Sequence, residues 1–281
     1  MRCLQSSLRL MERRTLLSVA GSLMLFGTHR DTPGISYTLT ITTTVSDQGI
    51  GGRDVVVGGH GVATARDQRL DIDSIAPNGT LLLPHDYFLM LDTGKTTQVG
   101  MENDIYTNEF NLSGAAGVHA ALPIGALDVT GLPINDFRAR LEPLSDKIVV
   151  SGYTARHFRV TIDYTVTSEQ EEVPFRSVVD VWMAQLPFKL SNPFEEVPLL
   201  DSVGPIRGVF GKLASIRRQM GAGAPLKTVT TTTIYYAATG GRRGANATSL
   251  DVVQTSQFSN IKSANVSPDQ FTIPRGFQKS G

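Results

Sequence analysis

Apolar and polar residues alternate with a period of two through much of the chain. From Ile35 to Ile41 the apolar side chains share one face, and serine and threonine occupy the other. Such alternation, with β-branched residues on the polar face, is typical of a strand with one buried face. The same pattern recurs most regularly over residues 157–166. The chain is therefore predicted to be mainly β.

Further strands follow at similar spacing. Residues 86–91 and 97–101 flank an Asp-Thr-Gly-Lys turn and predict a hairpin. Other predicted strands cover residues 69–75, 147–153, 177–184, 228–237 and 252–262. Residues 49–61 and 221–225 are predicted glycine-rich loops, and residues 187–198 an irregular crossing segment. Strands joined mostly by short polar turns indicate a large antiparallel sheet with one buried face.

Helical periodicity is confined to two places. Pro205 precedes residues 206–220, where apolar positions recur at helical spacing before Gly221. A second, weaker helix is predicted over residues 134–141. The predicted fold class is mainly β with α (α+β), one curved antiparallel sheet covered on its apolar face by one or two helices.

The N-terminus has the pattern of an export signal over residues 1–30. Arg13-Arg14 precedes an uncharged apolar stretch, residues 15–26, which is too short to span a bilayer comfortably. The arginine pair also resembles a twin-arginine signal. The segment is either cleaved or kept as a membrane anchor, and the alternative is a buried N-terminal helix.

Charge and cysteine content exclude some partners and some kinds of chemical site. The 281 residues carry 26 basic and 26 acidic side chains. Five of the arginines lie in residues 1–30, so the remainder is mildly acidic, which argues against nucleic acid as a partner. Cys3 is the only cysteine. Residues 31–281 therefore hold no disulfide, zinc-thiolate site or cysteine nucleophile, in keeping with export.

Motifs for catalysis or metal binding are weak. Asp92-Thr-Gly resembles the catalytic loop of an aspartic protease, but it occurs once and is followed by Lys95. No histidine pair has the spacing of a helical zinc site, so the five are predicted to be ordinary surface residues: His29, His60, His85, His119 and His157. No P-loop, GxSxG or dinucleotide motif occurs. No metal, cofactor or catalytic residue is predicted.

The order of several short sequences resembles one family of secreted bacterial proteins. These are Arg69-Leu-Asp-Ile-Asp-Ser74, the hairpin Tyr87 to Lys95, Asp104-Ile-Tyr-Thr107, Ser151 to Arg159, and Gly223 to Thr228. The most telling piece is Pro268-Asp-Gln-Phe-Thr-Ile-Pro-Arg-Gly-Phe277, which follows a strand. Over residues 35–277 the chain is similar to uncharacterised proteins related to the outer-membrane lipoprotein carrier and sorting (LolA/LppX-like) superfamily.

This resemblance implies that residues 31–281 form a single unclosed half-barrel, with helices against its concave face and an apolar cavity between them. In the carrier proteins that cavity holds acyl chains. The residues expected to line it are Leu39, Ile41, Phe88, Met90, Phe158, Val160, Ile162, Trp182, Phe210 and Leu213. The long segment from Thr107 to Leu144 departs from the carriers.

The predicted function is therefore the non-catalytic binding of a lipid, a lipoprotein acyl chain or another apolar ligand. A lipoprotein or envelope protein is a further expected partner. Two alternatives stay open, a periplasmic protein-interaction scaffold with a packed core and an aspartic-type hydrolase around Asp92. The expected location is periplasmic or extracellular, with membrane tethering if the export signal is not removed.

Overall fold

The computed structural model describes residues 31–47, 50–76, 84–92, 96–108, 134–167, 172–194, 207–236 and 248–280. The predicted export signal, residues 1–30, lies outside this part. The elements in chain order are β1 (Thr32–Asp47), β2 (Ile50–Ala63), β3 (Gln68–Ala76), β4 (Tyr87–Met90), β5 (Thr96–Gly100), β6 (Ile105–Asn108), β7 (Ile134–Val150), β8 (Tyr153–Thr167), β9 (Glu172–Ala184), α3 (Arg207–Met220), β10 (Ala224–Tyr236), β11 (Thr248–Val266), η4 (Pro268–Phe271) and β12 (Gln278–Lys279).

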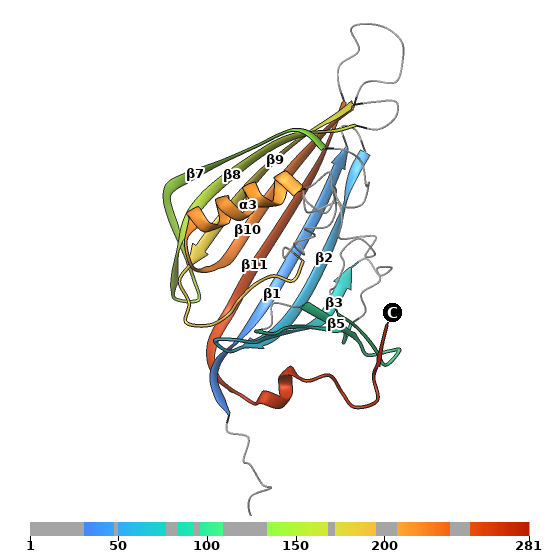
Figure 1. Cartoon of the computed structure of the whole chain (residues 1–281), viewed down its shortest axis with the longest axis vertical. Coiled ribbons are helices and arrows are strands. Elements are labelled where there is room, and N and C mark those ends of the chain that lie inside the picture. The colour runs from blue at the N-terminus through green and yellow to red at the C-terminus, as the bar shows by residue number, and fades with distance from the viewer. Residues whose placement is uncertain are drawn as a thin grey trace, which may run out of the picture.

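All of these strands belong to one open, curved sheet (Figure 1). Their order across it is β12-β6-β5-β4-β3-β2-β1-β11-β10-β9-β8-β7. Neighbouring strands run antiparallel, apart from the parallel pair of β12 and β6. Strand β1 pairs with β11, so strands from the two ends of the chain meet in the middle of the sheet. The predicted large antiparallel sheet is confirmed.

The strand register assigns each side chain to one of two faces, because directly opposed residues of paired strands point the same way. Val181 is opposite both Phe158 and Thr228. Thr228 is opposite Ser256, which is opposite Ile41. We call the face that carries these residues the inner face, because α3 packs on it, and the other the outer face.

Helix α3 covers the half of the sheet formed by β7, β8 and β9 (Figure 1). Its Ile216 and Met220 pack in one cluster with Phe158, Val160 and Met183. The prediction of this helix from its periodicity is confirmed. It ends before Gly221, whose φ of 86° is the left-handed conformation that commonly terminates a helix.

A non-helical segment, residues 185–194, covers the inner face at β3 and β4. Lys189 places its Nζ 2.9 Å from the carbonyl oxygen of Leu91, and Ser191 donates its backbone N–H to Gln68. Phe194 stacks edge-on against Phe88, with ring centroids 5.2 Å apart. The predicted irregular crossing segment, residues 187–198, is confirmed over residues 187–194, and its remainder lies outside the described residues. Within the described residues, helical cover of the sheet is confined to α3.

Residues 134–141 form the start of edge strand β7, so the prediction of a second helix there is wrong. Phe137, Ala139 and Leu141 alternate along β7 and pack against the cluster beneath α3. Pairing with β8 supplies the backbone hydrogen bonds of residues 134–141. These residues therefore form a strand, because their weak helix propensity is outweighed by tertiary packing.

Residues 50–61 form most of strand β2, so the prediction of a glycine-rich loop over residues 49–61 is also wrong. The glycines serve close packing rather than a turn. A Cβ at Gly59 would lie 2.5 Å from the carbonyl oxygen of Asp71, and a Cβ at Gly61 would lie 2.6 Å from the Tyr37 ring. The side chain of Tyr37 therefore occupies space on the inner face that a larger residue would need.

The C-terminal segment covers the outer face beside β4 and β5. Ile273 and Phe277 pack against Tyr87, Leu89 and Val99. The segment is also held by hydrogen bonds, since the Tyr87 hydroxyl donates to the carbonyl oxygen of Thr272 at 3.2 Å. Strand β12 then extends the sheet beyond β6.

Candidate functional site

Seven buried polar side chains lie together on the inner face, each no more than 6% exposed. The register places them on β1, β11, β10 and β9 in successive cross-strand rows. We call this set the polar lane: Thr43, Ser177, Thr228, Thr230, Thr232, Gln254 and Ser256.

The composition of each row changes across the sheet. The central row runs from Thr43 through Gln254 and Thr230 to Val179 and Val160. It passes from hydroxyl and amide groups in the middle of the sheet to aliphatic groups beneath α3. The inner face is therefore polar at its centre and apolar beneath the helix.

Hydrogen bonding in the lane leaves one donor unpaired. The hydroxyl oxygens of Ser177 and Thr232 lie 3.0 Å apart, within hydrogen-bonding distance. The amide Nε2 of Gln254 has no hydrogen-bond partner in the described part of the chain, although the residue is only 2% exposed. A buried donor left unpaired costs about 1–3 kcal/mol. Such a group calls for a functional or structural explanation.

Eight of the ten residues expected to line a cavity fall into two apolar clusters on either side of the lane. Phe158, Val160, Ile162 and Leu213 lie in the cluster beneath α3. Leu39, Ile41, Phe88 and Met90 lie in the cluster that extends to β4. The chain's own residues 185–194 pack on part of the second cluster, where Ser191 Oγ lies 3.7 Å from the Met90 sulfur.

The two other expected lining residues are placed differently. Trp182 packs against the margin of the second cluster, but the register assigns it to the outer face, where its ring stacks on His157 with centroids 4.1 Å apart. Phe210 belongs to α3, but its side chain lies outside the described part of the structure.

The polar lane was missed at the sequence level, although a signal for it exists. Threonine occupies both alternating positions of residues 230–233. A strand with threonine on both faces, placed in the middle of a covered sheet, must bury hydroxyl groups on one of them. Whether these hydroxyl groups are buried depends on which strands lie beside this one, and the local sequence pattern does not predict those neighbours.

A second polar cluster lies on the outer face around His157. The ring Nδ1 lies 2.8 Å from Asp146, and Nε2 lies 2.9 Å from Asp180. Each ring nitrogen therefore lies within hydrogen-bonding distance of a carboxylate. Arg159 adds two further hydrogen bonds to Asp180, at 2.8 and 3.1 Å. His157 is 6% exposed, so the prediction that it is an ordinary surface histidine is wrong.

These contacts stabilise both carboxylates in the ionised form. The hydrogen bond from His157 lowers the pKa of Asp146 below its ordinary value. Burial opposes ionisation of Asp180, but hydrogen bonds from Arg159 and His157 outweigh it, and the pKa of Asp180 is also lowered. The cluster thus links β7, β8 and β9 through short polar contacts, including the ion pair between Arg159 and Asp180.

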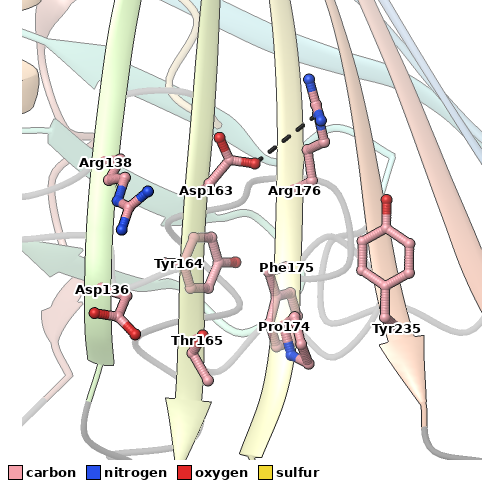
Figure 2. Close-up of a pocket in the computed structure, with 9 residues that line it drawn as sticks. All are labelled: Asp136, Arg138, Asp163, Tyr164, Thr165, Pro174, Phe175, Arg176 and Tyr235. Atoms are coloured by element: carbon pink, nitrogen blue, oxygen red, sulfur yellow. Dashed lines mark ion pairs between the residues drawn. The ribbon is translucent and has the colours of Figure 1, made fainter.

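The outer face also has a shallow hollow of about 270 Å³ across β7 to β10 (Figure 2). Arg138, Asp163 and Arg176 occupy directly opposed positions on three adjacent strands. The closest charged atoms of Arg176 and Asp163 are 3.9 Å apart. Arg176 and Asp163 are about half exposed and Arg138 is exposed, and alternating charges on a solvated sheet face contribute little binding energy by themselves.

The remaining candidates are dispersed. Asp92 is exposed at the end of β4, where its backbone N–H donates to Asp67. His60 is exposed and pairs with Asp73 at 2.7 Å. The described residues contain no group of three or more potential metal ligands. Within that same part of the chain, no helix has the length and apolar character needed to cross a membrane. His29 and His119 lie outside the described residues.

Comparison with known proteins gives only distant structural likenesses. No family model matches the chain, and no curated protein matches it. A structure of PNGF-II is similar over 87% of this chain at 11% identity and a TM-score of 0.34, and this chain spans only 31% of its length. A LolA superfamily protein from Nitrosomonas europaea is similar over 84% of this chain and 90% of its own, at 8% identity and a TM-score of 0.28.

Proposed function

We propose that this chain is an exported protein that binds a lipid or another amphiphile on the inner face of its half-barrel. The observation that carries this proposal is the arrangement of that face, with two apolar clusters on either side of a buried polar lane. Ligand sites are mostly apolar with a few placed polar groups that fix orientation. An amphiphile offers both kinds of group within one molecule.

The chemistry of the lane favours binding over catalysis. Its side chains are hydroxyls and one amide, which are neutral over the physiological pH range. Such groups orient a ligand through hydrogen bonds, whereas proton transfer near neutral pH needs a group that titrates there. We therefore propose a non-catalytic binding role, in the periplasm or outside the cell.

The packing at β3 and β4 favours a second candidate, a protein-interaction scaffold with a filled core. There, Phe88 and Met90 contact Phe194 and Ser191 of the same chain. If the lane is filled in the same manner, the inner face takes no ligand. The two candidates differ in whether the purified protein carries or takes up a lipid.

The test is native mass spectrometry of the full chain produced in a bacterial host, followed by solvent extraction of the bound material. We expect the wild-type protein to carry, or to take up, a lipid. Thr230→Trp fills the centre of the lane and should abolish this binding. Thr231→Trp is the matched control, because its side chain lies on the opposite face of the same strand.

Far-ultraviolet circular dichroism checks that both variants fold, and Thr230→Met replaces Thr230→Trp if the larger side chain prevents folding. A ligand-free wild-type mass, with no uptake of added lipid, contradicts the proposal and favours the scaffold. Equal lipid binding by the Thr230 and Thr231 variants would place the ligand away from the polar lane.

A further inference from the structure

Gln254 occupies the centre of the polar lane. It lies opposite Thr43 on β1 and opposite Thr230 on β10, and all three residues are at most 4% exposed. Its side chain is therefore fixed between two hydroxyl-bearing strands, on the face that α3 and residues 185–194 cover elsewhere.

The unpaired group of Gln254 is specifically a donor. Its Nε2 finds no acceptor among the described residues. Nε2 carries two N–H groups and no acceptor capacity, so it can be satisfied only by an oxygen or another acceptor. Leaving such a donor buried and unsatisfied destabilises the folded protein, so an acceptor at this position would be bound favourably.

Two other buried nitrogens without partners have different settings. Asn192 uses its Oδ1 to accept the backbone N–H of Phe194 at 3.1 Å, which fixes the turn in the covering segment. Trp182 lies on the outer face against His157. Of the unpaired buried nitrogens in the described part, only that of Gln254 belongs to the lane.

The surroundings of Gln254 define the acceptor it fits. The lane has no cationic side chain among its members, so a phosphate or carboxylate placed there would be a buried charge without a counter-charge. A neutral carbonyl oxygen carries no such penalty. Along the same row Val179 and Val160 lead to the apolar cluster beneath α3, which fits the hydrocarbon chain attached to that carbonyl.

We propose that Gln254 is the specificity-determining residue of the inner face, donating from Nε2 to the carbonyl oxygen of an acyl ester or amide. This inference rests on the proposed binding function and narrows it. The ligand class becomes acyl lipids, as opposed to ether lipids or hydrocarbons of the same shape. The carbonyl lies in the lane, and the acyl chain lies over the apolar residues beneath α3.

The test compares two probes that differ only in their two ester carbonyl groups, dioctanoylglycerol and its dioctyl ether analogue. Each displaces the apolar dye N-phenylnaphthylamine from the delipidated full-length protein. We expect the diester to bind about tenfold more tightly, the effect of one well-placed hydrogen bond to a donor that is otherwise buried and unpaired.

Gln254→Leu removes the donor and keeps the side-chain volume roughly constant. It should abolish the preference for the diester, and the empty protein should melt at the same or a higher temperature because the unpaired donor is gone. Gln254→Met provides the same comparison if the leucine variant does not fold. Gln257→Leu is the matched control, because Gln257 is exposed on the outer face of the same strand and should leave the preference unchanged.

The outcomes separate this inference from the proposed function. Equal binding of diester and diether by the wild-type protein overturns the role of Gln254 but leaves lipid binding intact. A tenfold preference that persists in Gln254→Leu also overturns it, because the carbonyl is then recognised elsewhere. Failure of the wild-type protein to bind the dye and both lipids overturns the proposed function itself.

Discussion

At the residue scale, neighbouring residues of strand β8 lie in different environments on the two faces of the sheet. Phe158 packs beneath α3, whereas His157 lies on the outer face between two carboxylates. Asp180 is the central acceptor of that cluster, because it receives hydrogen bonds from both His157 and Arg159. Its side chain is 18% exposed, so solvent screens these interactions only partly.

We expect Asp180→Asn to lower the free energy of unfolding by about 1.5–3 kcal/mol at pH 7, the range for hydrogen bonds to charged groups. Because its folded-state pKa lies below the ordinary 3.8, Asp180 stabilises the fold above that pH. The contribution is lost as pH falls through the lower folded-state pKa. The difference between wild type and variant, measured by urea denaturation, should therefore shrink below about pH 4.

Asp163→Asn is the control for this experiment. Its carboxylate faces one guanidinium at 3.9 Å and is 49% exposed, so the loss should be below about 1 kcal/mol. Equal losses for the two variants would mean that the His157 cluster adds no more stability than an ordinary surface ion pair.

At the scale of elements, β2 shows how packing makes a strand from a glycine-rich sequence. Gly61 lies opposite Tyr37, whose hydroxyl donates to the carbonyl oxygen of Arg69 at 2.8 Å and accepts from Gln68 at 2.8 Å. A Cβ at Gly61 would overlap both the backbone carbonyl oxygen of Arg69 and the buried Tyr37 ring, so this position has room only for glycine. The strand is thus held by a contact with a residue 24 positions earlier in the chain.

We expect Gly61→Ala to destabilise the protein by about 1–3 kcal/mol, the usual cost of overpacking a core. Gly58→Ala is the matched variant on the same strand, because its added Cβ meets only the movable Oγ of Ser74, at 2.8 Å. It should cost less than half as much. Thermal unfolding of both variants measures the difference, and a Gly58 variant as unstable as the Gly61 variant would contradict the close packing of Gly61 against Arg69 and Tyr37.

At the scale of the whole molecule, the C-terminal segment completes one side of the sheet. It covers Tyr87 and Leu89 on the outer face and pairs β12 with the edge of β6. Arg69 adds to this side by placing its guanidinium 3.9 Å from the Tyr87 ring centroid while donating to the carbonyl oxygen of Gln270. An uncovered sheet edge next to an apolar patch favours self-association.

Ending the chain at Ser267 should therefore lower the melting temperature by about 5–10 °C, the effect of partly exposing a few buried apolar side chains. It should also produce concentration-dependent oligomers in size-exclusion chromatography with light scattering. Arg275→Ala is the control, since this side chain is exposed and its loss should change neither measurement. A truncated chain that melts and elutes like the full chain would show that the segment is dispensable.

Local pattern was sufficient to predict the mainly β class, the antiparallel sheet, helix α3 and the hairpin of β4 and β5, because these depend on periodicity within a few residues. Tertiary structure decided three features that local periodicity does not encode: the conformation of residues 134–141, the packing of β2 and the polar lane. Pairing with β8 made residues 134–141 a strand, and close contacts with β3 and Tyr37 placed the glycines of β2 in the sheet. The polar lane arises only when β1, β9, β10 and β11 become neighbours, since burial of a threonine or of Gln254 depends on what lies across the sheet.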